Sequence, residues 1–354
     1  MTDFFPWEQH TVFGAGLIGC YLGGALSAQG FQSTLICRAT TKSKLTAGLK
    51  LTDYQNHEAI LPTMDVLDDK QLSAAKITVK KARFLWLTVK CTGIKQAVLD
   101  IAPLVDKNTI ILCCQNGLGS DAAVKQAYPE NMVLRVMVPF NVVELSPGHY
   151  HRGSEGKLTI EQNPQSKIGV STLVMSLHSE LLPVSTSTDM DALLWAKLQL
   201  NLGNSVNALA DIPVKAMLEQ RAYRRVIALL MEELLQVADA LKIKLPKVTA
   251  ISAHKIPMVL KLPNFIFSRV ANKMLEIDPK VRSSMWWDVS QGKPTEIEHI
   301  NGAILKQAKA LDLSCPANQK IRDLIIQLSH ETDLTDKQKP PIAAETLLAW
   351  VSGK

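Results

Sequence analysis

The segment Thr11–Gly19, which reads TVFGAGLIG, constrains the fold of this chain more than any other. It sets Gly14, Gly16 and Gly19 in a G-x-G-x-x-G pattern between a short β-type run and an apolar helical run. Such a loop lets the backbone approach a pyrophosphate, and the helix that follows offers free N–H groups and the positive end of its dipole. Because the motif stands between strand and helix, it predicts a dinucleotide-binding loop rather than a ligand-free glycine turn. The expected cofactor contacts in this loop are Gly14, Ala15, Gly16, Leu17, Ile18 and Gly19.

The residue after the second predicted strand indicates which dinucleotide binds. Chains that bind NAD usually carry Asp or Glu about twenty residues after the loop, for the ribose 2′-hydroxyl. This chain has Cys37-Arg38 there, with further Thr and Lys residues close behind. A guanidinium suits a 2′-phosphate, although Arg38 on its own is also compatible with a plain surface arginine. We therefore predict NADPH as the cofactor, with Arg38 on its 2′-phosphate.

The first half of the chain alternates short apolar runs with helical patterns. Parallel strands that are buried on both faces produce such continuous apolar runs. Strands are predicted at Thr11–Phe13, Thr34–Cys37, Phe84–Val89, Ile110–Cys114, Met132–Val138 and Val184–Thr188, with a strand pair within Tyr150–Gln162 and a helix over Leu17–Gln29. This alternation predicts a Rossmann-type, doubly wound parallel α/β sheet over residues 1–188.

Helical periodicity replaces the strand pattern after about residue 189. Apolar residues recur at helical spacing from Val226 to Leu241 and again from Ile297 to Leu311. Thr295 and Glu298 have the spacing of a capping box at the start of the second of these helices. We predict an all-helical second domain over residues 189–330. Residues 331–354 are mostly polar and are predicted to be a C-terminal extension outside the core.

Composition narrows the functional classes to which the chain can belong. The 354 residues predict about two domains, and a net charge of +6 from scattered Lys and Arg does not favour nucleic-acid binding. The six cysteines form no C-x-x-C and have no clustered His residues near them, so we expect no metal site and a reducing cytoplasm. No signal peptide and no 18-residue apolar run is present, so no membrane role is expected.

Two polar positions follow predicted strands. Lys90 comes after the run FLWLTV, and Asn116-Gly117 comes shortly after IILCC. Ligands of open α/β sheets bind outside the carboxyl ends of the strands, so both residues are candidates for the site. A solvent-facing lysine and a plain Asn-Gly turn are the alternatives.

The segment Leu193–Asn201, LLWAKLQLN, places a lysine among apolar residues. Lys197 has Asn201 one helical turn further on, and Asn204 and Ser205 follow on the next turn. Burial of an unpartnered amine is costly, so a lysine with amides on its own face favours a polar site. A lysine that extends to solvent along a narrow polar stripe is the alternative.

A third polar cluster runs from Ser283 to Gly302. Ser284 and Asp288 are one helical turn apart, and Glu296 falls in the first turn of the next predicted helix. A carboxylate is favourable at a helix N-terminus in any case, so a purely structural role for Glu296 stays open.

Together these segments resemble the ketopantoate reductase (2-dehydropantoate 2-reductase) family, from about Thr11 to Leu324. The resemblance rests on the glycine loop with its arginine, the strand-end lysine, Asn-Gly-x-Gly, W-x-K-L-x-x-N, and S-S-M-x-x-D followed by T-E-I-x-x-I-N-G. It implies a Rossmann domain followed by a helical domain, with the active site in the cleft between them.

The resemblance also implies roles for single residues. Lys197 matches the catalytic lysine, and Glu296 matches the glutamate that organises lysine and substrate. Substrate contacts are implied for Lys90, Asn116, Asn201, Ser205 and Ser284, and cofactor contacts for Arg38, Lys90, Asn116 and the glycine loop. The family often has a second asparagine where this chain has Ser205, and Asn204 would replace it only in an irregular helix.

The implied reaction is reduction of 2-dehydropantoate to pantoate with NADPH, in pantothenate (vitamin B5) and coenzyme A biosynthesis. Hydride from NADPH would reach the ketone while Lys197 acts as general acid. Reduction of a different small 2-oxo acid is one alternative, and a non-catalytic NADPH sensor is another. Apolar helix faces in the second domain favour a homodimer.

Overall fold

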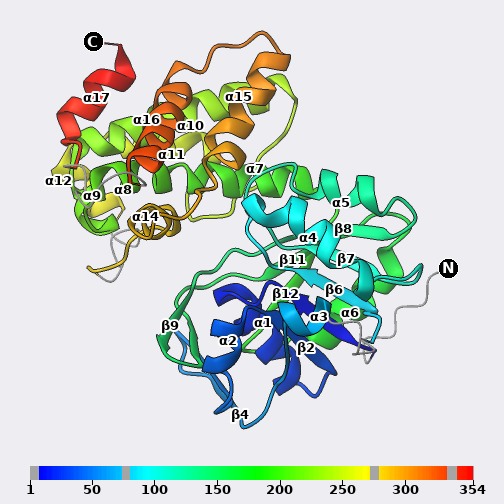
Figure 1. The fold of residues 1–354 in the computed structure, drawn as a ribbon. Coiled ribbons are helices and arrows are strands. Elements are labelled where there is room, and N and C mark those ends of the chain that lie inside the picture. The colour runs from blue at the N-terminus through cyan, green and yellow to red at the C-terminus, as the bar shows by residue number, and fades with distance from the viewer. Residues whose placement is uncertain (1–7, 74–79, 272–278, 333–340, 354) are drawn as a thin grey trace. The chain divides into compact units, whose positions relative to one another are not determined.

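The structure is a computed structural model that describes residues 8–73, 80–271, 279–332 and 341–353 (Figure 1). By its contacts the chain divides into two units. The first comprises Met1–Asn116 and Ser120–Met190, and the second comprises Gly117–Gly119 and Asp191–Lys354.

The first unit is built on an eight-stranded sheet with the order β12-β11-β8-β7-β6-β1-β2-β5. Its strands are β1 (His10–Phe13), β2 (Ser33–Cys37), β5 (Asp65–Asp68), β6 (Phe84–Leu87), β7 (Ile110–Cys113), β8 (Met132–Met137), β11 (Leu158–Glu161) and β12 (Val184–Ser187). Every neighbouring pair is parallel except β8 with β11, which is antiparallel. The predicted parallel strands are therefore confirmed.

Alternate residues of the central strands enter two separate cores. Val12 of β1 and Trp86 of β6 belong to one buried cluster, whereas Phe13 and Leu87 belong to another. Because neighbouring residues of a strand point to opposite faces, both faces of this sheet are covered. The helices of this unit are α1 (Leu17–Ala28), α2 (Ala39–Lys44), α3 (Asp69–Ser73), α4 (Ile94–Asp100), α5 (Asp121–Ala127) and α6 (Lys167–Leu177), with short 3₁₀ turns η1 (Cys91–Gly93) and η2 (Ala102–Leu104). The predicted Rossmann-type α/β fold is confirmed.

A second, four-stranded sheet was not predicted. Its order is β4-β3-β10-β9, with bounds Glu58–Leu61, Leu49–Asp53, His149–Arg152 and Val142–Ser146. The two strands predicted within Tyr150–Gln162 exist as β10 and β11, but their pairing with each other is wrong, because β10 pairs with β3 and β9 while β11 pairs with β8 and β12. The glycine-containing segment between β10 and β11 therefore carries the chain from one sheet to the other and forms no hairpin.

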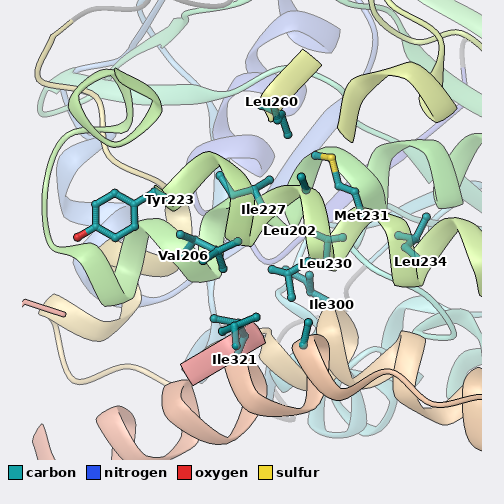
Figure 2. Packing of buried hydrophobic residues seen from close by; sticks show 14 of the residues in the cluster. Leu202, Val206, Tyr223, Ile227, Leu230, Met231, Leu234, Leu260, Ile300 and Ile321 are labelled. Carbon is teal, nitrogen blue, oxygen red and sulfur yellow. The ribbon is translucent and has the colours of Figure 1, made fainter. Parts of the chain in front are cut away.

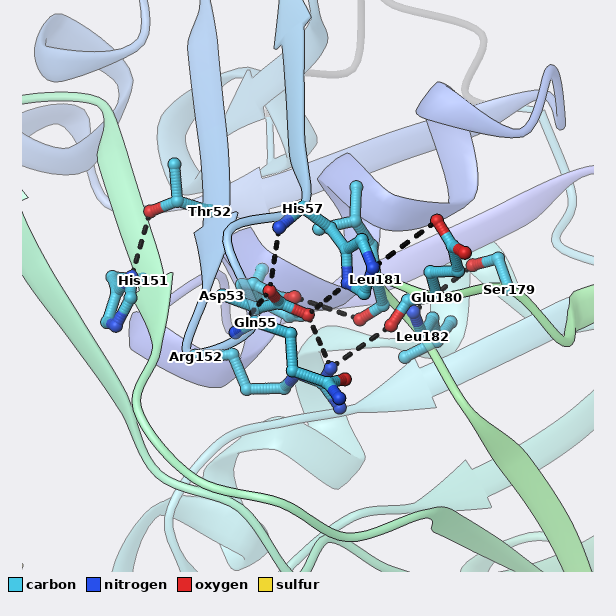
Figure 3. A network of polar contacts seen from close by, with 11 residues as sticks. Thr52, Asp53, Gln55, His57, His151, Arg152, Ser179, Glu180, Leu181 and Leu182 are labelled. Carbon is cyan, nitrogen blue, oxygen red and sulfur yellow. Dashed lines mark hydrogen bonds and ion pairs between the residues drawn. The ribbon is translucent and has the colours of Figure 1, made fainter.

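A buried ion pair joins β3 to β10 (Figure 3). Arg152 Nη2 donates to Asp53 Oδ2 at 2.7 Å and to the Glu180 carbonyl at 3.0 Å, and the side chains of both ion-pair partners are at most 1% exposed. The Asp53 carboxylate also accepts the backbone N–H groups of Gln55 and His57, each at 2.9 Å. Burial raises the pKa of Asp53, but the hydrogen bonds from His57 and Arg152 outweigh that effect and lower it to about 2.

The second unit is helical, and no strand occurs among its described residues. Its elements are α7 (Met190–Asn201), α8 (Gly203–Ala210), α9 (Val214–Glu219), α10 (Arg221–Ala240), η3 (Ala253–Lys255), α11 (Ile256–Leu260), α12 (Asn264–Val270), α14 (Ser284–Ser290), η4 (Ile297–His299), α15 (Asn301–Ala310), α16 (Pro316–Thr332) and α17 (Ala344–Ser352). Buried side chains of α10, among them Ile227, Leu230 and Leu234, lie in the middle of one apolar core (Figure 2). The predicted all-helical second domain is confirmed.

Two local predictions in the second unit are wrong. Residues 297–311 do not form one helix, because Ile300 leaves the helical conformation and separates η4 from α15. Residue 296 is the N-cap of η4, and no side chain caps that turn, so the capping box predicted from Thr295 and Glu298 does not form. Ile297 and Ile300 are each 3% exposed within the core, and their burial favours the compact turn over a continuous helix.

The interpretation of the C-terminal segment as lying outside the core is also wrong for residues 341–353. Leu347, Leu348 and Val351 of α17 are buried in the same core as α10. The Tyr223 hydroxyl donates to the Ile342 carbonyl at 2.6 Å, which fixes the entry to α17.

Candidate functional site

The glycine loop has the close packing that its sequence requires. Gly14 has φ +93°, and a Cβ built there would lie 2.4 Å from Val89 Cγ1 and 2.7 Å from the Val89 nitrogen. A Cβ on Gly19 would lie 2.6 Å from the hydroxyl of Thr88, and this hydroxyl donates to the Gly14 carbonyl at 2.9 Å. These two positions therefore admit only glycine without rearrangement, and they hold the loop against the end of β6.

Gly16 differs from the other two glycines. A Cβ built on it would meet no atom closer than the Gly14 carbonyl oxygen at 3.9 Å, and both Gly16 and Leu17 are exposed. Gly16 is the N-cap of α1, and the first turn of that helix carries no acidic residue. The backbone N–H groups at this helix end can therefore donate hydrogen bonds to an anion that approaches over Gly16.

Arg38 lies at the same edge of the sheet as the glycine loop. It directly follows β2, which is parallel to β1, and the loop directly follows β1. The Arg38 carbonyl accepts the N–H groups of Thr41 and Lys42 at 2.9 and 3.0 Å, so the residue begins α2 with an exposed side chain. A cation at this position can bind a phosphate on the ribose end of a dinucleotide.

Lys90 and Asn116 follow the ends of β6 and β7, which are adjacent parallel strands. Cys91 Sγ donates to the Asn116 carbonyl at 2.8 Å, so the two segments are in direct contact. The Gln115 side chain also ties them together, since its Nε2 donates to the Leu87 and Val89 carbonyls at 2.7 and 3.2 Å. The sequence did not predict this role of Gln115, because its partners are backbone carbonyls that only the folded structure brings to it.

In the second unit, Lys197 and Asn201 are partly buried on α7, one turn apart as expected. α7 ends at Asn201 and α8 begins at Gly203, with Leu202 between the two helices. Ser205 is fully buried, and its hydroxyl donates to the Leu202 carbonyl at 3.0 Å, whereas Asn204 is partly exposed. The interruption between α7 and α8 is confined to Leu202, whose φ of −61° and ψ of −27° are still helical, and a role for Asn204 in place of Ser205 stays a prediction.

Ser284 is exposed at the first position of α14, next to the N-cap residue Ser283. Ser283 is held by α8: its N–H donates to Asn207 Oδ1 at 2.9 Å and its hydroxyl donates to the Asn204 carbonyl at 3.1 Å. Asn207 is fully buried and was not singled out in the sequence, although it sets the start of α14. These bonds fix Ser284 relative to the helix that carries Asn204.

Glu296 is 6% exposed and stands immediately before η4. Its carbonyl accepts the N–H groups of His299 and Ile300 at 2.9 and 3.1 Å, which closes a single turn. Lys197, Asn201, Asn204, Ser284 and Glu296 therefore all belong to the second unit, and Arg38, Lys90, Asn116 and the glycine loop belong to the first.

No group of His, Cys, Asp and Glu residues able to hold a metal ion occurs among the described residues. No helix in the described part of the chain has the length and apolar character needed to cross a membrane. All six cysteines lie among the described residues, are buried and form no disulfide.

Two family models match the chain. One, described as "Ketopantoate reductase PanE/ApbA", covers residues 10–165, and the other, described as "Ketopantoate reductase PanE/ApbA C terminal", covers residues 189–329. A curated 2-dehydropantoate 2-reductase of Halobacterium salinarum is 22% identical over 320 residues, which is 89% of this chain and 96% of that protein.

Solved structures with the same fold span nearly the whole chain. A PanE/ApbA family ketopantoate reductase from Ralstonia eutropha is 25% identical with a TM-score of 0.74, covering 92% of this chain and 99% of that one. A ternary structure of D-mandelate dehydrogenase with NADH and anilino(oxo)acetate is 18% identical, also with a TM-score of 0.74, covering 92% of this chain and all of that one.

Proposed function

The chain belongs to the ketopantoate reductase family, since the two family models cover most of it, and from this premise we propose that it reduces 2-dehydropantoate to pantoate with NADPH. This reaction serves pantothenate and coenzyme A biosynthesis. One observation carries the proposal: a dinucleotide loop with a strand-end arginine occurs in the same chain as a helix that presents a lysine and an amide on one face.

Arg38 and the glycine loop support NADPH rather than NADH as the cofactor. The open side of Gly16 gives the pyrophosphate access to the helix N-terminus, and Arg38 supplies the cation for the 2′-phosphate. Lys90 and Asn116, at the ends of the next strands, would line the cofactor toward its reactive end. When bound, NADPH supplies the hydride that reduces the ketone.

The residues of the second unit would hold the substrate and deliver the proton. Lys197 donates a proton from Nζ to the oxygen that becomes the alcohol, and its positive charge stabilises the developing alkoxide. Asn201, Asn204 and Ser284 bind the polar groups of the 2-oxo acid. Glu296 orients the lysine and the substrate. Ser205, which is fully buried, has no place in this scheme.

The test follows NADPH oxidation by absorbance, with 2-dehydropantoate as substrate and NADH in parallel. We expect Lys197→Ala to lower kcat by about 10² or more, the usual scale for loss of an acid–base group. Lys309→Ala, an exposed lysine of α15, is the matched control and should be neutral. Arg38→Gln should raise KM for NADPH and leave KM for NADH nearly unchanged. A Lys197→Ala enzyme with normal turnover would refute the assignment.

A bulkier 2-oxo acid is the second candidate substrate. Trp287 is 52% exposed one turn after Ser284, and it contacts Trp286 edge-on with ring centroids 4.8 Å apart. An apolar surface beside a substrate-binding serine would favour a larger side chain on the 2-oxo acid. The same assay with a panel of 2-oxo acids ranks the two candidates, and NADPH binding without any turnover would instead indicate a sensor.

We further propose that the protein acts in the cytoplasm as a homodimer. Six buried cysteines without a disulfide support a reducing compartment. Exposed Met258, Phe265 and Val270, on α11 and α12 of the second unit, support a contact between copies. Light scattering of the purified protein would give its mass in solution.

A further inference from the structure

We propose that Asn318 of α16 is a positioning residue, which acts through Asn301 to hold the turn that carries Glu296. This inference rests on the proposed function, because it assigns Glu296 a part in the reaction. It is carried by a chain of hydrogen bonds, partly buried at Glu233 and fully buried between Asn318 and Asn301, from α10 through α16 to the first residue of α15.

The chain of bonds starts at Glu233 on α10. Its Oε1 accepts the Ala317 N–H at 2.7 Å, and its Oε2 accepts the Asn318 N–H at 2.8 Å and Asn318 Nδ2 at 2.7 Å. The carboxylate thus binds the first turn of α16, where the free N–H groups of a helix favour a negative charge. This arrangement fixes the N-terminus of α16 to α10.

Asn318 can be oriented in only one way. Its Nδ2 donates to the Glu233 carboxylate and to the Leu230 carbonyl, at 2.7 and 3.1 Å, and both of these groups only accept. Its Oδ1 is therefore left to accept Asn301 Nδ2, at 2.9 Å. Asn318 and Asn301 are both fully buried, so no solvent competes for this bond.

Asn301 transmits this fixed position to Glu296. It is the first residue of α15 and directly follows Ile300, whose N–H donates to the Glu296 carbonyl. Ile300 itself is embedded in the apolar core beside α10 (Figure 2). The turn from Glu296 to Asn301 is thus held by its own hydrogen bonds, by the core and by the amide of Asn318. Movement of Asn301 would therefore shift the backbone that carries Glu296.

A second link between the same two elements provides a matched control. Arg322 of α16 binds Glu298 of η4 through two nitrogens, at 3.0 and 2.6 Å, but the Glu298 side chain is 53% exposed. Ion pairs between exposed side chains contribute little to the free energy of folding. Arg322→Gln therefore tests whether any bond between α16 and the turn matters, or only the buried one.

The first experiment compares kcat and KM of purified variants with 2-dehydropantoate and NADPH. Asn301→Ala removes the link and leaves the Glu233–Asn318 contact in place, and Asn318→Asp replaces the donor with an oxygen that faces Glu233. We expect each to lower kcat about tenfold or more with KM for NADPH unchanged, since misplacement by about 1 Å costs up to 10² in rate. Arg322→Gln should stay within about twofold of the wild-type values.

The second experiment repeats Asn301→Ala in a Glu296→Ala background. If the Asn301–Asn318 bond acts through Glu296, Asn301→Ala should lower kcat little further in a protein that already lacks Glu296. The fold-losses of kcat in the two single variants then do not multiply in the double variant. Multiplied losses, or a folded Asn301→Ala enzyme with wild-type kcat, would overturn the proposal.

Hydrogen exchange separates this proposal from the proposed function. The amides of His299 and Ile300 should exchange about tenfold faster in Asn301→Ala than in wild type or in Arg322→Gln, whichever substrate the enzyme uses. Wild-type protein that fails to turn over 2-dehydropantoate would refute the proposed substrate, whereas unchanged exchange at these two amides would refute the link.

Discussion

Replacement of Asp53 by Asn should destabilise the protein in a pH-dependent way. The wild-type carboxylate is buried against Arg152, and its pKa is lowered from 3.8 to about 2. Each unit of difference between folded and unfolded pKa corresponds to 1.36 kcal/mol, so the ionised carboxylate contributes about 2 kcal/mol at neutral pH. The variant also leaves a buried guanidinium without its counter-charge, which raises the expected cost to about 3–5 kcal/mol.

The sign of the pH dependence follows from which state binds the proton first. Below about pH 4 the unfolded chain protonates Asp53 while the folded protein still holds a carboxylate, so acid favours unfolding. The contribution is complete above about pH 5, falls by about half at pH 3, and is lost as the pH passes below about 2. The gap between wild type and Asp53→Asn should therefore narrow by about 1 kcal/mol between pH 5 and pH 3.

Urea unfolding followed by circular dichroism, from pH 3 to pH 7, measures this gap. With a slope of about 3 kcal/mol/M, the variant should unfold about 1 M earlier at pH 7. Asp239→Asn, at an ion pair with His254 in which both side chains are more than half exposed, is the control and should leave the midpoint in place. A gap that stays constant from pH 5 to pH 3 would show that the hydrogen bonds from His57 and Arg152 do not lower the pKa of Asp53 in the folded protein.

Two further predictions concern the loop and the C-terminal helix. Gly16→Ala should fold normally but lose NADPH binding, because the added methyl group meets no protein atom closer than the Gly14 carbonyl oxygen at 3.9 Å and lies where the pyrophosphate would approach. Gly14→Ala should instead cost about 2–4 kcal/mol of stability, since its φ is +93° and its Cβ would collide with Val89. Thermal unfolding with and without NADPH distinguishes the two, and equal behaviour would contradict the assigned geometry. Leu347→Ala should destabilise by about 2–4 kcal/mol as a fully buried residue, whereas Trp350→Ala, at a side chain 48% exposed, should have a much smaller effect on the same unfolding midpoint.

The helices and strands that could be predicted are those whose burial is evident from the residue types of the segment itself. Phe84–Leu87 is buried on both faces, so every residue is apolar and the strand is plain from composition. β3, with the sequence LKLTD, alternates buried and partly exposed residues and includes charged side chains, and its partner β10 lies about a hundred residues further on. No local pattern specifies that pairing.

The candidate site follows the same division. The glycine loop and the lysine with its neighbouring amide could be predicted because chemistry demands those residue types at fixed spacings. Gln115, Asn207 and Asn318 were missed because their partners are backbone groups, or a carboxylate and an amide, that only the tertiary structure brings to them. In the sequence alone, these three residues cannot be distinguished from polar residues on the surface.

The pairing of β3 with β10 also bears on how the first unit reaches its folded state. The bond between Arg152 and Asp53 closes a loop of 99 residues. Contacts so distant in sequence carry a large loop-closure entropy and form late, after the local βα units have condensed. An interaction made after the folding barrier slows unfolding without speeding folding. We therefore expect the ion pair to lower the unfolding rate of the four-stranded sheet and to leave its folding rate nearly unchanged.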